Sequence, residues 1–154
     1  MKVAGRWCYL YRAIDRDGEL LDSMLSEHRN KHAARRFLRR LVEVAERKPL
    51  RVTTDRHPAY RRAIRWILGR KVLHRTNQYL NNLTEQSHRA VKQRYYPMLG
   101  FGSFESAARF CAAFDELRQY FRVRRRGEGN VSLAEQRRLF LTRWRSLISE
   151  LAVA

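Results

Sequence analysis

Strand-like and helix-like segments alternate along most of this chain, and that alternation limits its fold more than any other feature. Residues 6–14 are rich in aromatic and β-branched side chains, which favours a buried strand, and residues 15–18 are typical of a hairpin turn. A returning strand is predicted over 20–25. Asn30 can then cap a helix with apolar side chains at helical spacing, which Pro49 ends.

The alternation continues in the middle of the chain. Residues 50–54 predict a short strand, and Asp55 stands where it stops. Pro58 is tolerated in the first turn of a helix, which predicts a second helix to about Gly69. A weaker strand pattern covers residues 71–75. Strands that alternate with helices predict an α/β fold, in which helices pack on a mixed sheet.

Helical patterns fill the rest of the chain. Residues 83–95 have helical periodicity, and Ser103 can cap a long helix with an apolar stripe. A basic, glycine-containing stretch follows, and Ser132 opens a capping box for a last helix. We therefore predict a compact α/β region over 1–122 and a basic linker with a C-terminal helix over 123–154.

Positive charge dominates the composition. The chain has 33 Lys and Arg residues against 15 Asp and Glu residues, a formal net charge of +18. Because such an excess repels itself in the compact state, a polyanion is the expected partner, and nucleic acid is the first candidate. The sequence has no run of about 18 apolar residues and no secretory signal pattern near Met1, which predicts a cytoplasmic protein without a membrane partner.

Three side chains with reactive or stacking potential are assigned to the core. Cys8 lies in an aromatic stretch and Cys111 on an apolar helical stripe, so the sequence predicts neither a disulfide framework nor a paired zinc motif. Trp7 is expected to pack in the core rather than to form a base-stacking platform.

Two acidic residues occupy positions suited to metal-dependent chemistry. Asp55 is expected at the sheet edge where α/β proteins bind ligands. One helical face, within roughly 100° of arc, collects a carboxylate and three basic groups: Glu85, His88, Arg89 and Lys92. Carboxylates that hold magnesium at a phosphodiester suit two-metal phosphoryl transfer, and the cations beside them can hold phosphates.

The same residues also have a purely structural interpretation. Asp55 can cap the helix that begins near Pro58. Glu85 can form a solvated ion pair with Arg89, four residues on, worth a few tenths of a kcal/mol. Residue types alone favour this interpretation over a metal site.

Four sequence blocks, in order, resemble one enzyme family. The blocks are GRWCYLYRAIDRDG (5–18), VTTDRHPAY (52–60), YLNNLTEQSHR (79–89) and GFGSF (100–104). Over about residues 2–122 the chain resembles the catalytic domain of DDE transposases of insertion-sequence family six. The resemblance implies a ribonuclease-H-like fold and DNA transposition, in which insertion-sequence ends are cleaved and joined to target DNA. It also implies Mg²⁺ or Mn²⁺ as cofactor, with two ions in the complete family site.

The resemblance assigns roles to single residues. Asp55 corresponds to the second acid of the catalytic, metal-binding triad, and Glu85 to the third. Lys92, seven residues after Glu85, takes the place of a basic residue that contacts DNA in the family. We expect Arg89 and His88 to contact DNA beside it.

Two departures from the family pattern lead to further expectations. The family's first catalytic aspartate, and its helical region that binds the element ends, lie upstream of the stretch that begins here at Lys2. We therefore expect an incomplete first strand and a truncated chain that alone neither cleaves nor joins DNA. The interval from Asp55 to Glu85 is also a few residues shorter than is usual in the family.

Two functions follow from these observations. The first is a DDE transposase core, an enzyme of nucleotidyl transfer that acts on element ends and target DNA in the prokaryotic nucleoid. It can assemble with a second copy or with a full-length transposase. The alternative is a non-catalytic, basic DNA-binding fragment that regulates or competes with a full-length transposase.

Overall fold

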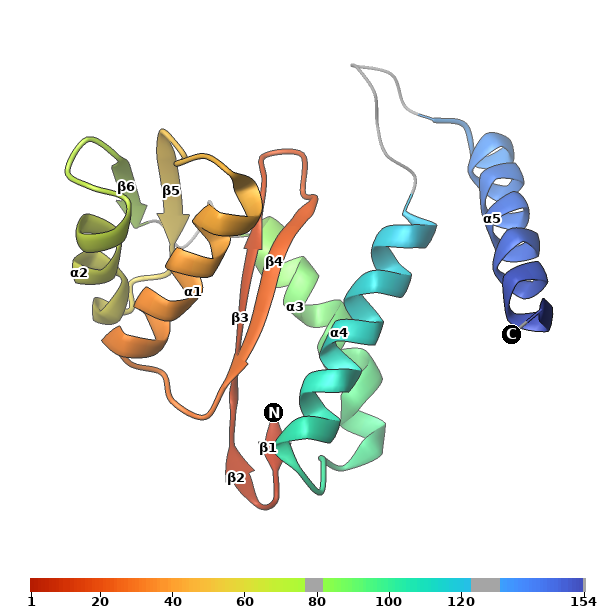
Figure 1. The fold of residues 1–154 in the computed structure, drawn as a ribbon, viewed down its shortest axis with the longest axis horizontal. Helices are drawn as coiled ribbons and strands as arrows, with labels where there is room; N and C mark the ends of the chain where they lie inside the picture. The colour runs from red at the N-terminus through yellow and green to blue at the C-terminus, as the bar shows by residue number, and fades with distance from the viewer. Residues whose placement is uncertain (77–81, 123–130, 154) are drawn as a thin grey trace. The chain divides into compact units, whose positions relative to one another are not determined.

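A computed structural model of the chain describes residues 1–76, 82–122 and 131–153. The chain divides into two compact units, Met1–Phe114 and Asp115–Ala154 (Figure 1). The expected boundary after residue 122 stays a prediction, because residues 123–130 lie outside the described residues. Among the described helices, none combines the length and the hydropathy that a membrane-spanning segment needs.

The elements alternate much as the sequence predicts. In chain order they are β1 (Lys2–Val3), β2 (Arg6–Trp7), β3 (Tyr9–Ile14), β4 (Leu20–Ser26), α1 (Lys31–Ala45), β5 (Arg51–Thr54), α2 (Pro58–Ile67), β6 (Leu73–Thr76), α3 (Asn82–Tyr95), the 3₁₀ helix η2 (Tyr96–Met98), α4 (Phe104–Phe121) and α5 (Leu133–Val153).

The N-terminal segment forms two antiparallel hairpins. β1 pairs with β2 through a tight turn, in which Gly5 has a φ of +77° that favours glycine. β3 pairs with β4, and Asp15 Oδ1 fixes the turn between them by accepting hydrogen bonds from the backbone N–H groups of Asp17 and Glu19. The predicted hairpin is confirmed, but the strand expected over 6–14 is interrupted at Cys8.

α1 covers one side of the larger hairpin, and α2 packs against α1. Asn30 Oδ1 accepts hydrogen bonds from two backbone N–H groups in the first turn of α1, so the predicted cap is confirmed. α1 ends at Ala45, and Glu46 then takes a left-handed conformation, so the helix ends before Pro49. Tyr11, Phe37 and Ile64 belong to the buried core that joins β3, α1 and α2.

The strands pair two by two in the described residues, as β1–β2, β3–β4 and β5–β6. β5 and β6 are parallel and the other pairs antiparallel, so the predicted mixture of pairings is present. The predicted single sheet, however, does not form there. Ala13 of β3 and Val52 of β5 pack against the same core, so side-chain packing rather than main-chain hydrogen bonding connects the two larger pairs.

A second core lies under the N-terminus and α4. Val3, Cys8 and Ala107 are buried in it, and Cys111 is also buried, which confirms the core assignment of both cysteines. Phe101 N donates to Lys2 O of β1, and Phe101 O accepts from Ala4 N in the turn after β1. α4 begins shortly after Phe101.

The second unit consists of the end of α4 and the helix α5. Ser132 Oγ accepts a hydrogen bond from Glu135 N at 3.2 Å, which confirms the predicted cap. Arg143 Nη1 donates to the carbonyl oxygens of Tyr120 and Arg122 at 2.8 and 2.7 Å. The predicted C-terminal helix is therefore present. Its Arg143 side chain provides hydrogen bonds to carbonyl groups at the end of α4.

Candidate functional site

An open cavity of ≈ 850 Å³ is bounded by β3, the loop before α1, the end of β5 and the exposed face of α3. All five residues that were predicted to form the site line this cavity: Asp55, Glu85, His88, Arg89 and Lys92. We call it the carboxylate cavity. Residues 79–81 of the third sequence block lie outside the described residues.

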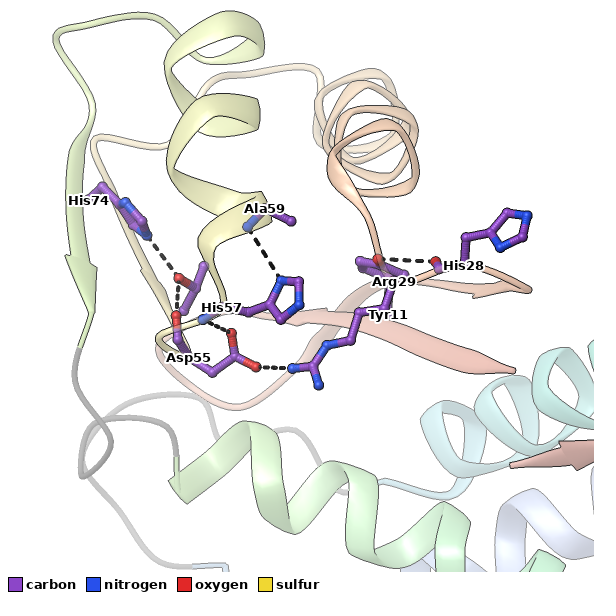
Figure 2. Close-up of polar contacts among 8 residues, drawn as sticks. Tyr11, His28, Arg29, Asp55, His57, Ala59 and His74 are labelled. Carbon is purple, nitrogen blue, oxygen red and sulfur yellow. Dashed lines mark hydrogen bonds and ion pairs between the residues drawn. The ribbon is translucent and has the colours of Figure 1, made fainter. Parts of the chain in front are cut away.

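The end of β5 and the turn after it position Asp55. Its Oδ1 accepts a hydrogen bond from His57 N at 3.1 Å (Figure 2). Thr54 Oγ1 donates to Asp55 O at 2.9 Å and lies 2.8 Å from His74 Nε2, which ties β5 to β6. The N-cap of α2 is His57, whose Nδ1 accepts from Ala59 N. The interpretation of Asp55 as that cap is therefore wrong.

A cation holds the second carboxylate oxygen of Asp55. Arg29 Nη2 donates to Asp55 Oδ2 at 2.7 Å, and the two side chains are 44% and 42% exposed (Figure 2). Ion pairs at such exposure contribute only about 0–1 kcal/mol to stability. The pair therefore contributes little to the stability of the fold.

The sequence-based assignment of the site missed Arg29, although a signal for it exists. Arg29 directly precedes the helix cap Asn30. Because α1 and the strand that follows it run in opposite directions, the start of α1 and the end of β5 lie at the same end of the fold. Arg29, which directly precedes Asn30, therefore lies close to Asp55.

Two tyrosines lie beside this ion pair. Burial raises the pKa of the Tyr60 phenol above its ordinary value, and the negative charge of Asp55 raises it further. Burial also raises the pKa of Tyr11, whose hydroxyl donates to the His28 carbonyl oxygen at 3.4 Å. Both phenols therefore stay protonated at neutral pH, and neither can serve as a general base there.

α3 has one face that packs in the fold and one face that is exposed. Arg12 Nε of β3 donates to Ser87 Oγ at 3.0 Å, and both residues are buried. Val91 is buried as well. These contacts hold α3 against β3 and leave its other face to the carboxylate cavity.

Glu85 lies in the first turn of α3, where the helix dipole favours a negative charge. Its side chain is exposed. Among the described residues, the ion pairs join other partners and none connects Glu85 with Arg89. The predicted structural role of Glu85 as the ion-pair partner of Arg89 is therefore not found.

Trp7 does not pack in the core. Its side chain is 61% exposed and lines the carboxylate cavity. The expectation of a buried Trp7 is wrong because each strand of the β1–β2 hairpin has only two residues, and both residues of β2 are exposed.

The donor set of the cavity fits a hard divalent cation in part. Carboxylate oxygens such as those of Asp55 and Glu85 are the ligands that Mg²⁺ prefers. In the described residues, no group of three or more His, Cys, Asp or Glu side chains is placed to hold a metal ion. Asp15 and Asp17 lie in the β3–β4 turn and do not line the cavity.

Comparison with known proteins places this geometry in context. The family model described as "DDE domain" matches residues 1–124. A Staphylococcus aureus protein, the transposase for the insertion sequence-like element IS431mec, is 42% identical over 98 residues. The transposase for the insertion sequence element IS257 in transposon Tn4003, also from Staphylococcus aureus, has the same identity over the same length.

Each of these alignments covers 61% of this chain and 43% of the relative, so the chain spans less than half the length of these transposases. An uncharacterized protein of Yersinia pseudotuberculosis, pYV0051, is 42% identical over 66 residues, which are 42% of this chain and 62% of that protein. No solved structure matches the chain.

Proposed function

The chain belongs to the DDE-domain family of insertion-sequence transposases, and we propose that its carboxylate cavity is part of an active site that cleaves and joins DNA at insertion-sequence ends. One observation carries the proposal. Asp55 and Glu85, thirty residues apart, come from different elements and line the same cavity with several cations.

Asp55 and Glu85 act as metal ligands in this proposal. Each offers exposed carboxylate oxygens to a Mg²⁺ or Mn²⁺ ion, and water or DNA phosphate supplies the remaining ligands. When bound, the metal polarises the phosphodiester and activates the attacking oxygen. A bound ion would take the place of Arg29 at the Asp55 carboxylate.

The basic face of α3 holds the DNA. Lys92 and Arg89 bind phosphates on the strand that reaches the carboxylates, and His88 lies beside them. Fixing the phosphate places it in line with the attacking oxygen. The new phosphorus–oxygen bond forms as the bond to the leaving oxygen breaks, so strand joining needs no external energy source.

The complete family site has three acids, of which the described residues bring two to the cavity. We therefore expect the 154-residue chain to bind metal ions and DNA but to neither cleave nor join DNA alone. Mg²⁺-dependent strand transfer by the purified chain would overturn this expectation. The proposal includes a ribonuclease-H-like arrangement, because Asp55 stands at the carboxyl end of a strand.

Metal-dependent DNA binding tests the proposal. We would measure DNA affinity with and without Mn²⁺ for the parent chain and for Asp55→Asn and Glu85→Gln, which remove charge with little change of shape. Glu105→Gln is the matched control, because Glu105 is exposed and lies outside the cavity. Mn²⁺ should tighten DNA binding by the parent and the control only. An equal response in all four proteins would refute the metal site.

The alternative is a non-catalytic DNA-binding module that regulates or competes with a full-length transposase. The net charge of +18 favours it, because phosphate contacts alone can then give affinity. Asp55→Ala and Glu85→Ala separate the two functions. DNA binding in Mg²⁺ changes with these substitutions if the carboxylates hold metal, and it persists if charge alone binds DNA. In either case we propose that the chain acts on prokaryotic DNA in the cytoplasm, as a homo-oligomer or with a full-length transposase.

A further inference from the structure

Exposed aromatic rings line part of the carboxylate cavity. Trp7, Tyr9 and Tyr96 are 61%, 38% and 59% exposed. All three line the cavity, and we call them the aromatic wall. Large aromatic side chains at such exposure give the fold little burial energy, so a contact outside the core is the better explanation for their place.

Regular elements hold the three rings. Trp7 lies on β2 opposite Lys2, and Tyr9 lies on β3 opposite Ser26. The Tyr96 ring meets the edge of the buried Tyr95 ring, with 4.8 Å between the centroids and 66° between the planes. A ligand that stacks on these rings therefore meets surfaces whose backbone is already ordered, which lowers the entropic cost of binding.

Positively charged groups extend from the carboxylates toward the aromatic wall. Lys92 follows Glu85 by seven residues on α3, a distance of about 10 Å along the helix axis at 1.5 Å per residue. Lys92 and Met1 line the same cavity, and the Met1 nitrogen donates to Cys8 O next to Trp7. A strand whose phosphates contact Lys92 would therefore pass the wall a few nucleotides from the carboxylates.

Bases inside a continuous duplex cannot use such a wall, because neighbouring base pairs cover both of their faces. Unpaired bases expose a π-face and stack on aromatic side chains regardless of sequence. We propose that the aromatic wall binds unpaired nucleobases of the DNA strand that enters the carboxylate cavity. The substrate class is then DNA that is single-stranded or opened near the reacting phosphate, rather than continuous duplex. This inference rests on the proposed function of the cavity.

Two DNA probes test the inference: a blunt duplex, and the same duplex with an unpaired tail of a few nucleotides. The parent chain should bind the tailed duplex at least about fivefold more tightly, as expected for one stacked base. Trp7→Ala should abolish this preference, and Trp7→Phe should keep part of it. Trp66→Ala is the matched control, because Trp66 is 70% exposed but lies outside the cavity.

Fluorescence gives a readout that does not depend on affinity. The chain has three tryptophans, so Trp66→Phe with Trp144→Phe leaves Trp7 as the only one. The tailed duplex should quench its emission and the blunt duplex should not. Emission that depends on protein concentration without DNA would show that a second copy covers the wall, which would overturn the inference.

The failure of this inference is distinct from that of the proposed function. Equal binding of both probes, with the Mn²⁺ response of Asp55 and Glu85 intact, overturns the aromatic wall alone. If Mn²⁺ does not tighten DNA binding by the parent chain, the metal site is overturned. The proposed course of the DNA strand from the carboxylates to the aromatic wall is then overturned as well. Because Trp7 is exposed, its substitution should not unfold the chain, and circular dichroism of Trp7→Ala checks this.

Discussion

Arg29 neutralises Asp55 through a 2.7 Å ion pair at the point where we propose that a metal ion binds. The guanidinium and the divalent cation therefore compete for one carboxylate. The side chain that stabilises the metal-free cavity thus weakens metal binding, and the two effects can be measured separately.

We predict that Arg29→Gln tightens Mn²⁺ binding by about fivefold, since a unit charge at about 4 Å in water contributes ~1 kcal/mol. Isothermal titration with Mn²⁺ measures this change. Arg16→Gln is the control, because it removes an exposed ion pair with Asp17 away from the cavity and should leave the affinity unchanged. Weaker Mn²⁺ binding by Arg29→Gln would mean that Arg29 supports the metal site.

A second ion pair is expected to behave differently because one partner is buried. The Asp22 side chain is 6% exposed and pairs with Arg40 at 2.7 Å, while its Oδ2 has no hydrogen-bond partner among the described residues. Arg40→Gln should destabilise the fold by about 1–3 kcal/mol, the cost of leaving a buried charged group poorly paired. Urea denaturation measures the loss. Adding Asp22→Asn to the Arg40→Gln chain should restore part of the lost stability. If the double variant is as unstable as Arg40→Gln alone, this explanation is contradicted.

Local signals made the helices predictable. Asn30, Ser103 and Ser132 each accept a backbone hydrogen bond from the first turn of the helix that follows, and their side chains carry that tendency in the sequence. The end of α1 was less predictable, because Glu46 takes a left-handed conformation that its residue type does not signal.

Non-local relationships were harder to predict. The helical spacing of α3 correctly placed Glu85 and Lys92 on one face, since it depends only on helical geometry. Strand pairing depends on contacts between distant segments, so one sheet was expected where the described strands form separate pairs. The exposure of Trp7 was missed for a related reason, because aromatic composition indicates a strand but not whether its faces are covered.

The contact between His74 and Thr54 predicts a pH dependence of stability. Burial, and next the charge of Arg61, lower the pKa of His74 below the ordinary value of 6.5. The unfolded chain therefore binds a proton more readily at this site than the folded chain does. The contribution of His74 is complete above pH 6.5 and is lost as the pH falls from there through the folded pKa.

Urea denaturation at a series of pH values below neutral tests this expectation. His74→Gln keeps a side-chain N–H for Thr54 Oγ1 but does not titrate, so it should reduce the loss of stability in acid. His32→Gln is the control, because His32 is exposed and should leave the pH dependence as it is. If His74→Gln has the same pH profile as the parent chain, the titrating group lies elsewhere.

The proposed phosphate contact of Lys92 predicts a change in salt dependence. Each phosphate contact in duplex DNA contributes about 0.9 to the slope of log affinity against log salt, because binding releases condensed counterions. Lys92→Gln should therefore lower the slope by about one contact and weaken binding of different sequences to a similar extent. Lys48→Gln, which makes the same charge change at an exposed site outside the cavity, is the matched control. Fluorescence anisotropy over a salt series measures both slopes. An equal decrease in both variants would show that net charge alone attracts the DNA, whereas a decrease confined to Lys92→Gln would place a phosphate at the basic face of α3.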